Sequence, residues 1–461
     1  MPTDHSVWPL RSSPFGEESA QFANARRLQP RPAGEVSGAE GSGSSPHAGT
    51  IVRAVDGPGA SARHVAPARP TQASDERVSA AGLVFSRPPG GERLFYLDNL
   101  KALLISGIIA AHAVMGYADF GSWSYQDVQE VTLSPVVETL FVVVSITLGG
   151  LFLMGLFFLL SGLMTHDSLA RKGPARFVSD RLLRLGIPFA VYTLLVWPLL
   201  EFALLEPFLH RGSYWAWFTD TDPVLDNGPM WFVGVLLLFS LALVVWRRLL
   251  PPRPTPERTL RWRDLVLLSM AVGIVTFGVR IVYPADSNQV LNSHLWAWPE
   301  YIAMFGLGVV AARRGWLRSI PSALARRAGF ATLAMMVMLP AFILSAEPFG
   351  LSEDAYFGGW GLPALLGAML EGVIAVSAPI WVLAFAQRRL NNSGRLRRAM
   401  ARGSYAAFML QGPVLIALEL TFRSVDLSGD LKALVVATLG IVGSFALAWP
   451  LVTRTPLRRI L

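Results

Sequence analysis

Long apolar runs alternate with short polar segments from residue 97 almost to the end of the 461-residue chain. Each run approaches the roughly 20 residues that an α-helix needs to cross a bilayer. We therefore predict membrane-spanning helices at ten places: 97–118, 137–165, 182–205, 229–249, 264–283, 295–313, 327–346, 362–386, 403–422 and 431–453. The second run is long for a single span, and we expect it to tilt or kink around Gly149 and Gly150.

The first 92 residues have the opposite pattern, because they are rich in Pro, Gly, Ser, Ala and Arg and contain few large apolar side chains. Such a segment buries too little apolar surface to offset the entropy cost of ordering. We predict a disordered cytoplasmic tail over residues 1–92, followed by one all-α, ten-span membrane domain over residues 93–461. A start codon assigned too far upstream is the alternative explanation for the tail.

The composition supports a polytopic membrane protein, since 52% of the residues are hydrophobic and only 16% are charged. Soluble domains carry about 25% charged residues. The chain has no cysteine, which excludes disulfides, thiol nucleophiles and cysteine-based metal sites.

The net charge of +8 belongs to the membrane part, because the tail holds nine Arg and nine acidic residues. These positive charges lie in short loops, an arrangement that disfavours nucleic acid as a partner. Between three and six Lys or Arg residues occur in every second loop, at 166–184, 247–263, 313–327, 388–402 and 454–461, whereas the alternate loops contain only Arg211 and Arg423. Positive charge marks the cytoplasmic side, so we expect a cell-membrane protein with both termini in the cytoplasm.

The outer loops combine acidic and aromatic residues, among them Trp123, Trp215 and Asp226. One interpretation is the aromatic belt typical of membrane interfaces. The other is a sugar-binding surface built from rings and carboxylates.

His112 is the main candidate for chemistry, because an ionisable side chain within a membrane span indicates function. Lys101 precedes it by eleven residues, which places both on one helical face with a rise of about 16 Å between them. Lys101 then lies at the cytoplasmic end of the span, where Asp98 can pair with it at the i, i+3 spacing. The alternative for Lys101 is a cation that extends from a helix end towards water.

Arg181 and Arg184 follow the same i, i+3 spacing at the cytoplasmic start of the third span. With Lys101 they would form a cradle for phosphate groups. The alternative is ordinary positive charge on the cytoplasmic side.

Arg280 and Glu371 are predicted to lie at the depth of His112, so that either could contact it. A structural ion pair between the two is equally compatible with their positions. Four other glutamates in the apolar runs are expected near the outer rim, in contact with water: Glu138, Glu201, Glu300 and Glu419.

Several other chemistries lack their motifs. No H-x-x-x-H or H-E-x-x-H spacing occurs, so we expect no metal. A G-x-S-x-G elbow and a P-loop are also missing, which argues against a serine hydrolase and an NTPase.

The segment YLDNLKALLISGIIAAH (96–112) resembles the opening of the acyltransferase-3 superfamily of membrane O-acyltransferases. That family has a basic residue ten residues before a histidine in its first span, as Lys101 and His112 are, and an R-x-x-R pair at the inner end of a span, as Arg181 and Arg184 are. Further family-like blocks follow in order: LFFLLSG, NGPMWFVGVLLLFS, EYIAMFGLGVVAARRGWL and GSYAAFMLQGPV. Many members have histidine in the last block where this chain has Gln411.

The resemblance implies transfer of an acyl group, often acetyl from acetyl-CoA, to a hydroxyl of a sugar or another acceptor. Acyl-CoA would be a co-substrate rather than a bound cofactor, with its phosphates held by Lys101, Arg181 and Arg184. His112 would act as general base or accept the acyl group itself. Polysaccharide, glycolipid, glucan and glycosylated metabolite all stay open as acceptors.

Two other functional classes compete with this interpretation. One is a transporter or flippase in which His112, Arg280 and Glu371 form a proton relay. The other is a non-enzymatic receptor or scaffold, which Gln411 would favour if a histidine at that position is required for chemistry.

Overall fold

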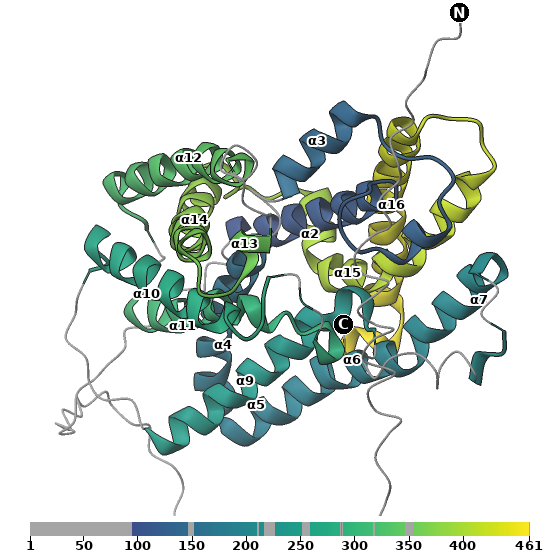
Figure 1. Ribbon diagram of the computed structural model, residues 1–461. Helices are drawn as coiled ribbons and strands as arrows, with labels where there is room; N and C mark the ends of the chain where they lie inside the picture. The colour runs from purple at the N-terminus through teal and green to yellow at the C-terminus, as the bar shows by residue number, and fades with distance from the viewer. Residues whose placement is uncertain are drawn as a thin grey trace, which may run out of the picture. The chain divides into compact units, whose positions relative to one another are not determined.

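The computed structural model describes residues 95–145, 152–209, 212–215, 226–250, 259–285, 287, 289–316, 319–345 and 354–460. Helices dominate these ranges, which contain no β-strand (Figure 1). The predicted tail lies outside them. The longer helices are α2 (Phe95–Met115), α3 (Pro135–Val144), α4 (Met154–Lys172), α9 (Trp231–Leu249), α10 (Trp262–Arg280), α11 (Trp298–Arg314), α12 (Ser322–Leu344), α14 (Leu362–Arg389), α15 (Arg395–Arg423) and α16 (Gly429–Arg454).

Nine helical segments of the described ranges are long and apolar enough to cross a membrane, and they correspond to nine of the ten predicted spans. Within the predicted span 137–165 the structure describes α3, which ends at Val144, and α4, which begins at Met154, and residues 146–151 lie outside the described ranges. Helix α4 is less apolar because its last turns run through polar residues from His166 to Lys172. The glycines where we predicted a kink, Gly149 and Gly150, lie outside the described residues.

Several helices extend into segments that the apolar pattern assigns to loops. Helix α14 continues to Arg389 and α15 begins at Arg395, so the predicted loop 388–402 is reduced to a short linker. Arginine is a good helix former, whereas hydropathy marks only the part of a helix that suits the bilayer interior. The apolar pattern therefore locates helices well and their ends poorly.

The third span is one long helix with two π-helical turns, which follows α5 (Pro174–Arg181), η3 (Leu182–Gly186), α6 (Ile187–Val191), η4 (Tyr192–Val196) and α7 (Trp197–Leu209). A proline lacks the backbone N–H and clashes with the carbonyl four residues earlier. Pro188 and Pro198 each follow such a turn, and the affected carbonyls, those of Arg184 and Leu194, lie within η3 and η4. The prolines thus account for the two irregular turns.

Close helix pairs surround the candidate site. Helix α2 packs against both α15 and α16, and α4 packs along α11 (Figure 1). Glycines permit the α4–α11 contact, because a Cβ on Gly162 would meet the carbonyl oxygen of Phe305 and a Cβ on Gly308 would meet that of Leu159. Small residues of this kind allow membrane helices to approach closely.

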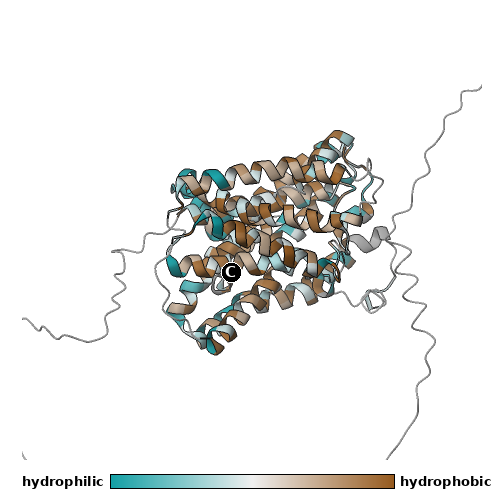
Figure 2. Cartoon of the chain, turned by 60° about the vertical axis from the view of Figure 1, so that its left-hand side comes forward, coloured by the Kyte–Doolittle hydropathy of each residue, from teal (hydrophilic) through white to brown (hydrophobic). Residues whose placement is uncertain are grey.

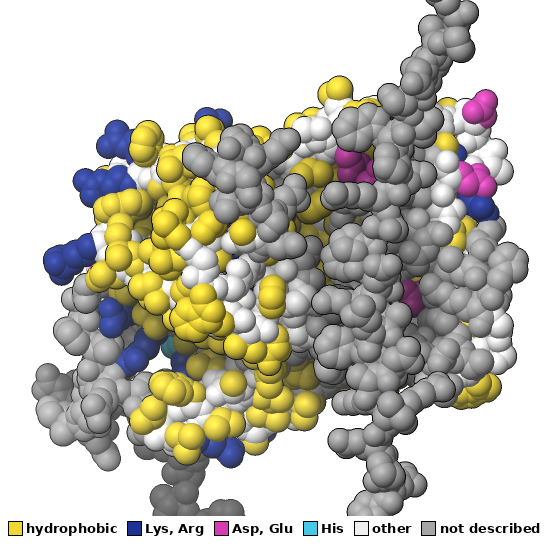
Figure 3. All heavy atoms as spheres, viewed as in Figure 1, with side chains coloured by type: hydrophobic (Ala, Val, Ile, Leu, Met, Phe, Trp, Pro, Cys, Tyr) yellow, Lys and Arg dark blue, Asp and Glu magenta, His cyan; other side chains and the backbone are white. Residues whose placement is uncertain are grey.

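The outward surface of the described helices is apolar along their length and polar near their ends (Figure 2). Large apolar side chains such as Leu267, Ile274, Val337 and Val442 are more than half exposed. A soluble protein rarely exposes apolar surface on this scale. On the face that Figure 3 draws, Lys and Arg gather mainly at the left edge and acidic side chains on the right half, as expected for a membrane protein with differently charged sides.

Candidate active site

His112 lies in the last turn of α2, and its side chain is partly exposed. Its Nδ1 is 3.2 Å from Oε1 of Gln411 on α15. Its ring stacks on the indole of Trp123, with 4.8 Å between the ring centroids and 11° between the planes. The imidazole is therefore fixed both at one nitrogen and on one face.

The contact with Gln411 sets the chemistry of the imidazole. Oε1 of an amide can only accept a hydrogen bond, so Nδ1 of His112 is the donor in this arrangement. A neutral imidazole that donates at Nδ1 keeps the lone pair of Nε2 available for a proton or an acyl group. Gln411 thus occupies a position where it orients His112, and its side chain is fully buried.

Trp123 is not a simple interfacial belt residue, because only 7% of its surface is exposed. One neighbour of its indole is the imidazole of His112, and another is Trp197, 5.9 Å away between ring centroids. Nε1 of Trp197 donates to Oδ2 of Asp226 at 3.0 Å, and Tyr192 stacks on Trp197. Trp123 therefore joins His112 to a cluster that contains Tyr192 and Trp197 of the third span and Asp226.

Glu419 is buried, contrary to our prediction for the glutamates near the outer rim. We expected it near the outer rim in contact with water, but it is fully buried on α15. Nε1 of Trp123 donates to both of its carboxylate oxygens, at 3.2 and 3.0 Å. Glu300 is also buried, with 8% exposure. The position of each glutamate inside an apolar run marked both as candidates for a functional role. Depth along a helix, however, does not predict which residues cover a side chain.

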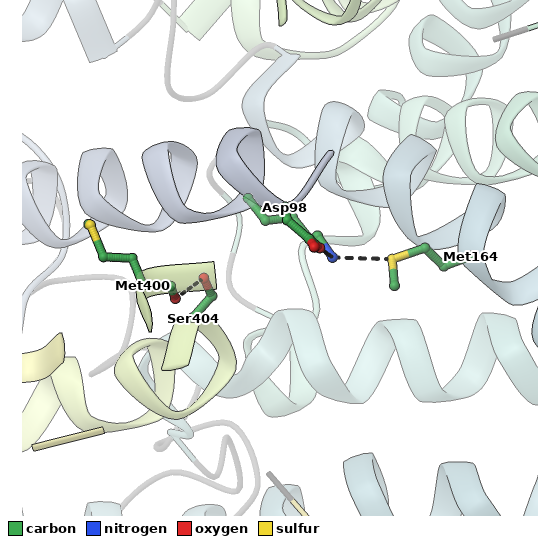
Figure 4. Close-up of polar contacts among 5 residues, drawn as sticks. Asp98, Met164, Met400 and Ser404 are labelled. Atoms are coloured by element: carbon green, nitrogen blue, oxygen red, sulfur yellow. Dashed lines mark hydrogen bonds and ion pairs between the residues drawn. The ribbon is translucent and has the colours of Figure 1, made fainter. Parts of the chain in front are cut away.

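At the other end of α2, Nζ of Lys101 lies 3.2 Å from Oδ1 of Asp98, as the i, i+3 spacing predicts. It also lies 3.6 Å from Sδ of Met164 on α4. Figure 4 shows Asp98 and Met164 pointing towards this amine from their two helices, and it also draws the hydrogen bond that Ser404 donates to the carbonyl oxygen of Met400 on α15. The N-terminal end of α2, which is its predicted inner end, thus lies beside α4.

Arg181 reaches the same turn of α4, because its Nη2 donates to Oγ1 of Thr165 at 3.3 Å, next to Met164. Its guanidinium also lies 4.9 Å from the ring centroid of Phe177. Nε of Arg184 is 3.2 Å from Oδ1 of Asp180 on the same helix. The structure therefore brings Lys101 and Arg181 to one turn of α4, with Arg184 beside them in η3.

Arg280 and Glu371 bind each other and show no contact with His112 among the described residues. Nη1 of Arg280 donates to Oε1 of Glu371 at 2.9 Å, and Nη2 is 2.6 Å from Oε2. The guanidinium also lies 5.3 Å from the ring centroid of Trp296. Such a bidentate pair is the geometry that arginine and a carboxylate prefer. Of the two arrangements that the sequence allows, the structure therefore shows the mutual ion pair and not a contact with His112.

Comparison with known proteins addresses the identity of the whole arrangement. Neither the search of curated proteins nor the search of solved structures found a match. The comparison with protein families matched residues 94–453 to the acyltransferase-3 family, which is described as an acyltransferase domain. Because this match covers most of the chain, the protein belongs to the acyltransferase-3 family of membrane acyltransferases.

Proposed function

We propose that this protein transfers an acyl group, acetyl in the simplest case, from acyl-CoA to a hydroxyl of a carbohydrate or glycosylated acceptor. The observation that carries the proposal is the two-ended arrangement along α2. Cations gather at its first turns, and a partly exposed imidazole lies eleven residues further on the same helix. The positive loops would place the cations on the cytoplasmic side of the cell membrane, with both termini in the cytoplasm.

The inner end of α2 suits the donor because its cations outnumber its carboxylates. Asp98 and Asp180 lie among four cations, which are Lys101, Lys172, Arg181 and Arg184. The phosphates of acyl-CoA would bind there through charge-assisted hydrogen bonds. The extended pantetheine arm would then carry the thioester the roughly 16 Å to His112.

His112 would act as general base through Nε2. It takes the proton of the acceptor hydroxyl while that oxygen attacks the thioester carbonyl carbon. The C–S bond then breaks, and the CoA thiolate leaves and takes the proton from the imidazolium. In the alternative, Nε2 attacks the thioester itself and forms an acyl-histidine that the acceptor hydroxyl later opens.

Release of free CoA by the purified protein tests the proposal. A thiol reagent suits this assay, because the chain has no cysteine of its own. We expect CoA release that depends on the acceptor and is lost in His112→Ala. Retained acyl transfer in that variant would contradict the role of His112, and substrate uptake without any acyl donor would favour a transporter. An acyl mass added to the His112 peptide in the absence of acceptor would identify the acyl-histidine route.

A further inference from the structure

Glu419 is a buried carboxylate whose only hydrogen bonds among the described residues come from the indole of Trp123. No Lys, Arg or His of the described chain pairs with it. By contrast, Glu371, which keeps 21% of its side-chain surface exposed, is held by Arg280. Glu419 therefore accepts hydrogen bonds from an indole instead of pairing with a cation.

A glycine makes room for the carboxylate of Glu419, because any side chain at that glycine would displace it. A Cβ on Gly116 would meet Oε1 of Glu419, and Gly116 directly follows α2, with its N–H donating to the carbonyl oxygen of His112. Burial of a carboxylate away from water is costly unless hydrogen bonds compensate for it. The missing side chain of Gly116 thus leaves the space in which this carboxylate is buried, close to the imidazole.

The ring that Glu419 holds is the ring that covers His112. Trp123 contacts both the imidazole and Trp197, and its nearly parallel stacking on His112 depends on the tilt of the indole. The hydrogen bonds from Nε1 to Glu419 fix that tilt at the end away from the backbone. The loop is fixed as well, since Nε2 of Gln126 donates to the carbonyl oxygen of Ala118 at 2.8 Å.

Trp197 repeats the same arrangement one ring further away. Its indole N–H is also held by a carboxylate, that of Asp226, which accepts the backbone N–H of Gly228 as well. Two neighbouring indoles are thus each oriented by an acidic side chain from another part of the chain. This repetition indicates a wall of fixed rings rather than an accidental contact.

We propose that Glu419 is a positioning residue that acts through Trp123, by holding the indole flat against the imidazole of His112. The fixed indole restricts the ring to one orientation and limits access to its covered face. The catalytic consequence rests on the proposed function of His112, whereas the geometric consequence does not.

Carbethoxylation of His112 by diethyl pyrocarbonate, followed on its peptide by mass spectrometry, tests the geometry without any need for activity. In Glu419→Leu the indole loses its acceptor, and we expect labelling of His112 to become about tenfold faster. Glu419→Gln retains an acceptor oxygen and should label at the rate of the unchanged protein. Trp123→Phe should match Glu419→Leu, and the double variant should be no faster than either single variant.

Glu300→Leu provides the matched control, because Glu300 is similarly buried but does not contact Trp123 or His112. Its labelling rate should stay unchanged, and gel filtration in detergent checks that each variant is folded. If the purified protein releases CoA from the donor, kcat should fall about tenfold in Glu419→Leu with little change in the donor KM.

Three results would overturn the positioning role: unchanged labelling in Glu419→Leu, Glu419→Gln behaving like Glu419→Leu, or additive effects of the Glu419 and Trp123 changes. Failure of the proposed function would look different. The labelling pattern would then hold while His112→Ala still transferred acyl groups.

Discussion

The two ends of α2 hold their key side chains in opposite ways. At the inner end, Lys101 pairs with Asp98 of its own helix and keeps a quarter of its side-chain surface exposed. At the outer end, the partners of His112 among the described residues come from α15 and from the loop that follows α2. A group that binds a charged donor gains from mobility and water, whereas a group that moves a proton gains from fixed neighbours.

The difference also separates charge from orientation. The cations at the inner end have neighbours that phosphates could replace. Lys101 pairs with Asp98, and Arg184 pairs with Asp180. Gln411 and Trp123 carry no charge that could attract a ligand to His112. Changes at the inner end should therefore alter donor affinity, and changes at the outer end should alter the rate of the chemical step.

The largest effect is expected for His112→Asn, which tests the outer end directly. The amide cannot serve as a base near neutral pH, so kcat should fall about 1,000-fold. The donor KM should change little, because the phosphates would bind at the other end of the helix. Steady-state CoA release at varied donor concentration measures both constants. A large rise in KM with unchanged kcat would erase the distinction between the two ends.

Arg280→Met is expected to change stability rather than catalysis. It leaves Glu371 without its partner, and breaking a buried pair in this way costs about 3–5 kcal/mol. We expect a lower midpoint of thermal unfolding in detergent, with kcat of the folded fraction close to that of the unchanged protein. Glu371→Gln should lose less, because a neutral amide can still accept from the guanidinium. Loss of kcat without loss of stability would instead assign the pair to the active site.

Replacement of Arg181 and Arg184 together by Gln should raise the donor KM about 100-fold, since each guanidinium would contribute one charge-assisted hydrogen bond. The KM of the unchanged protein should also rise with salt concentration, and this salt dependence should weaken in the variant. Arg248 on α9 offers a control cation without a proposed donor contact. An unchanged donor KM would leave both arginines as determinants of topology alone.

The sequence predicted the inner end better than the outer end for a physical reason. The Lys101–Asp98 pair is local, so helical periodicity alone places the two side chains together. The contacts of His112 join residues 299 positions apart for Gln411 and pass through an irregular loop for Trp123. Periodicity gives depth and direction but does not say which helix lies opposite, which is why contact with His112 and a mutual ion pair both stayed open for Arg280 and Glu371.

The fold shows the same limit. Apolar runs located nine of the helices correctly, since each run must satisfy its backbone hydrogen bonds internally within lipid. They placed the ends of α14 and α15 poorly, because both helices continue into arginine-rich segments. They also missed the burial of Glu419, which depends on Trp123 and on the space above Gly116.

The smallest effect is expected for replacements of Gln411, and it tests how the outer end orients its histidine. Gln411→Leu removes the acceptor for Nδ1 of His112, so kcat should fall about tenfold, as for other residues that orient a catalytic imidazole. Gln411→His should keep most of the activity, because a neutral imidazole can also present an acceptor nitrogen to Nδ1. Steady-state CoA release compares the three proteins at saturating donor. If Gln411→His were as slow as Gln411→Leu, glutamine here would not replace the histidine of related sequences, and the orientation of His112 would have another source.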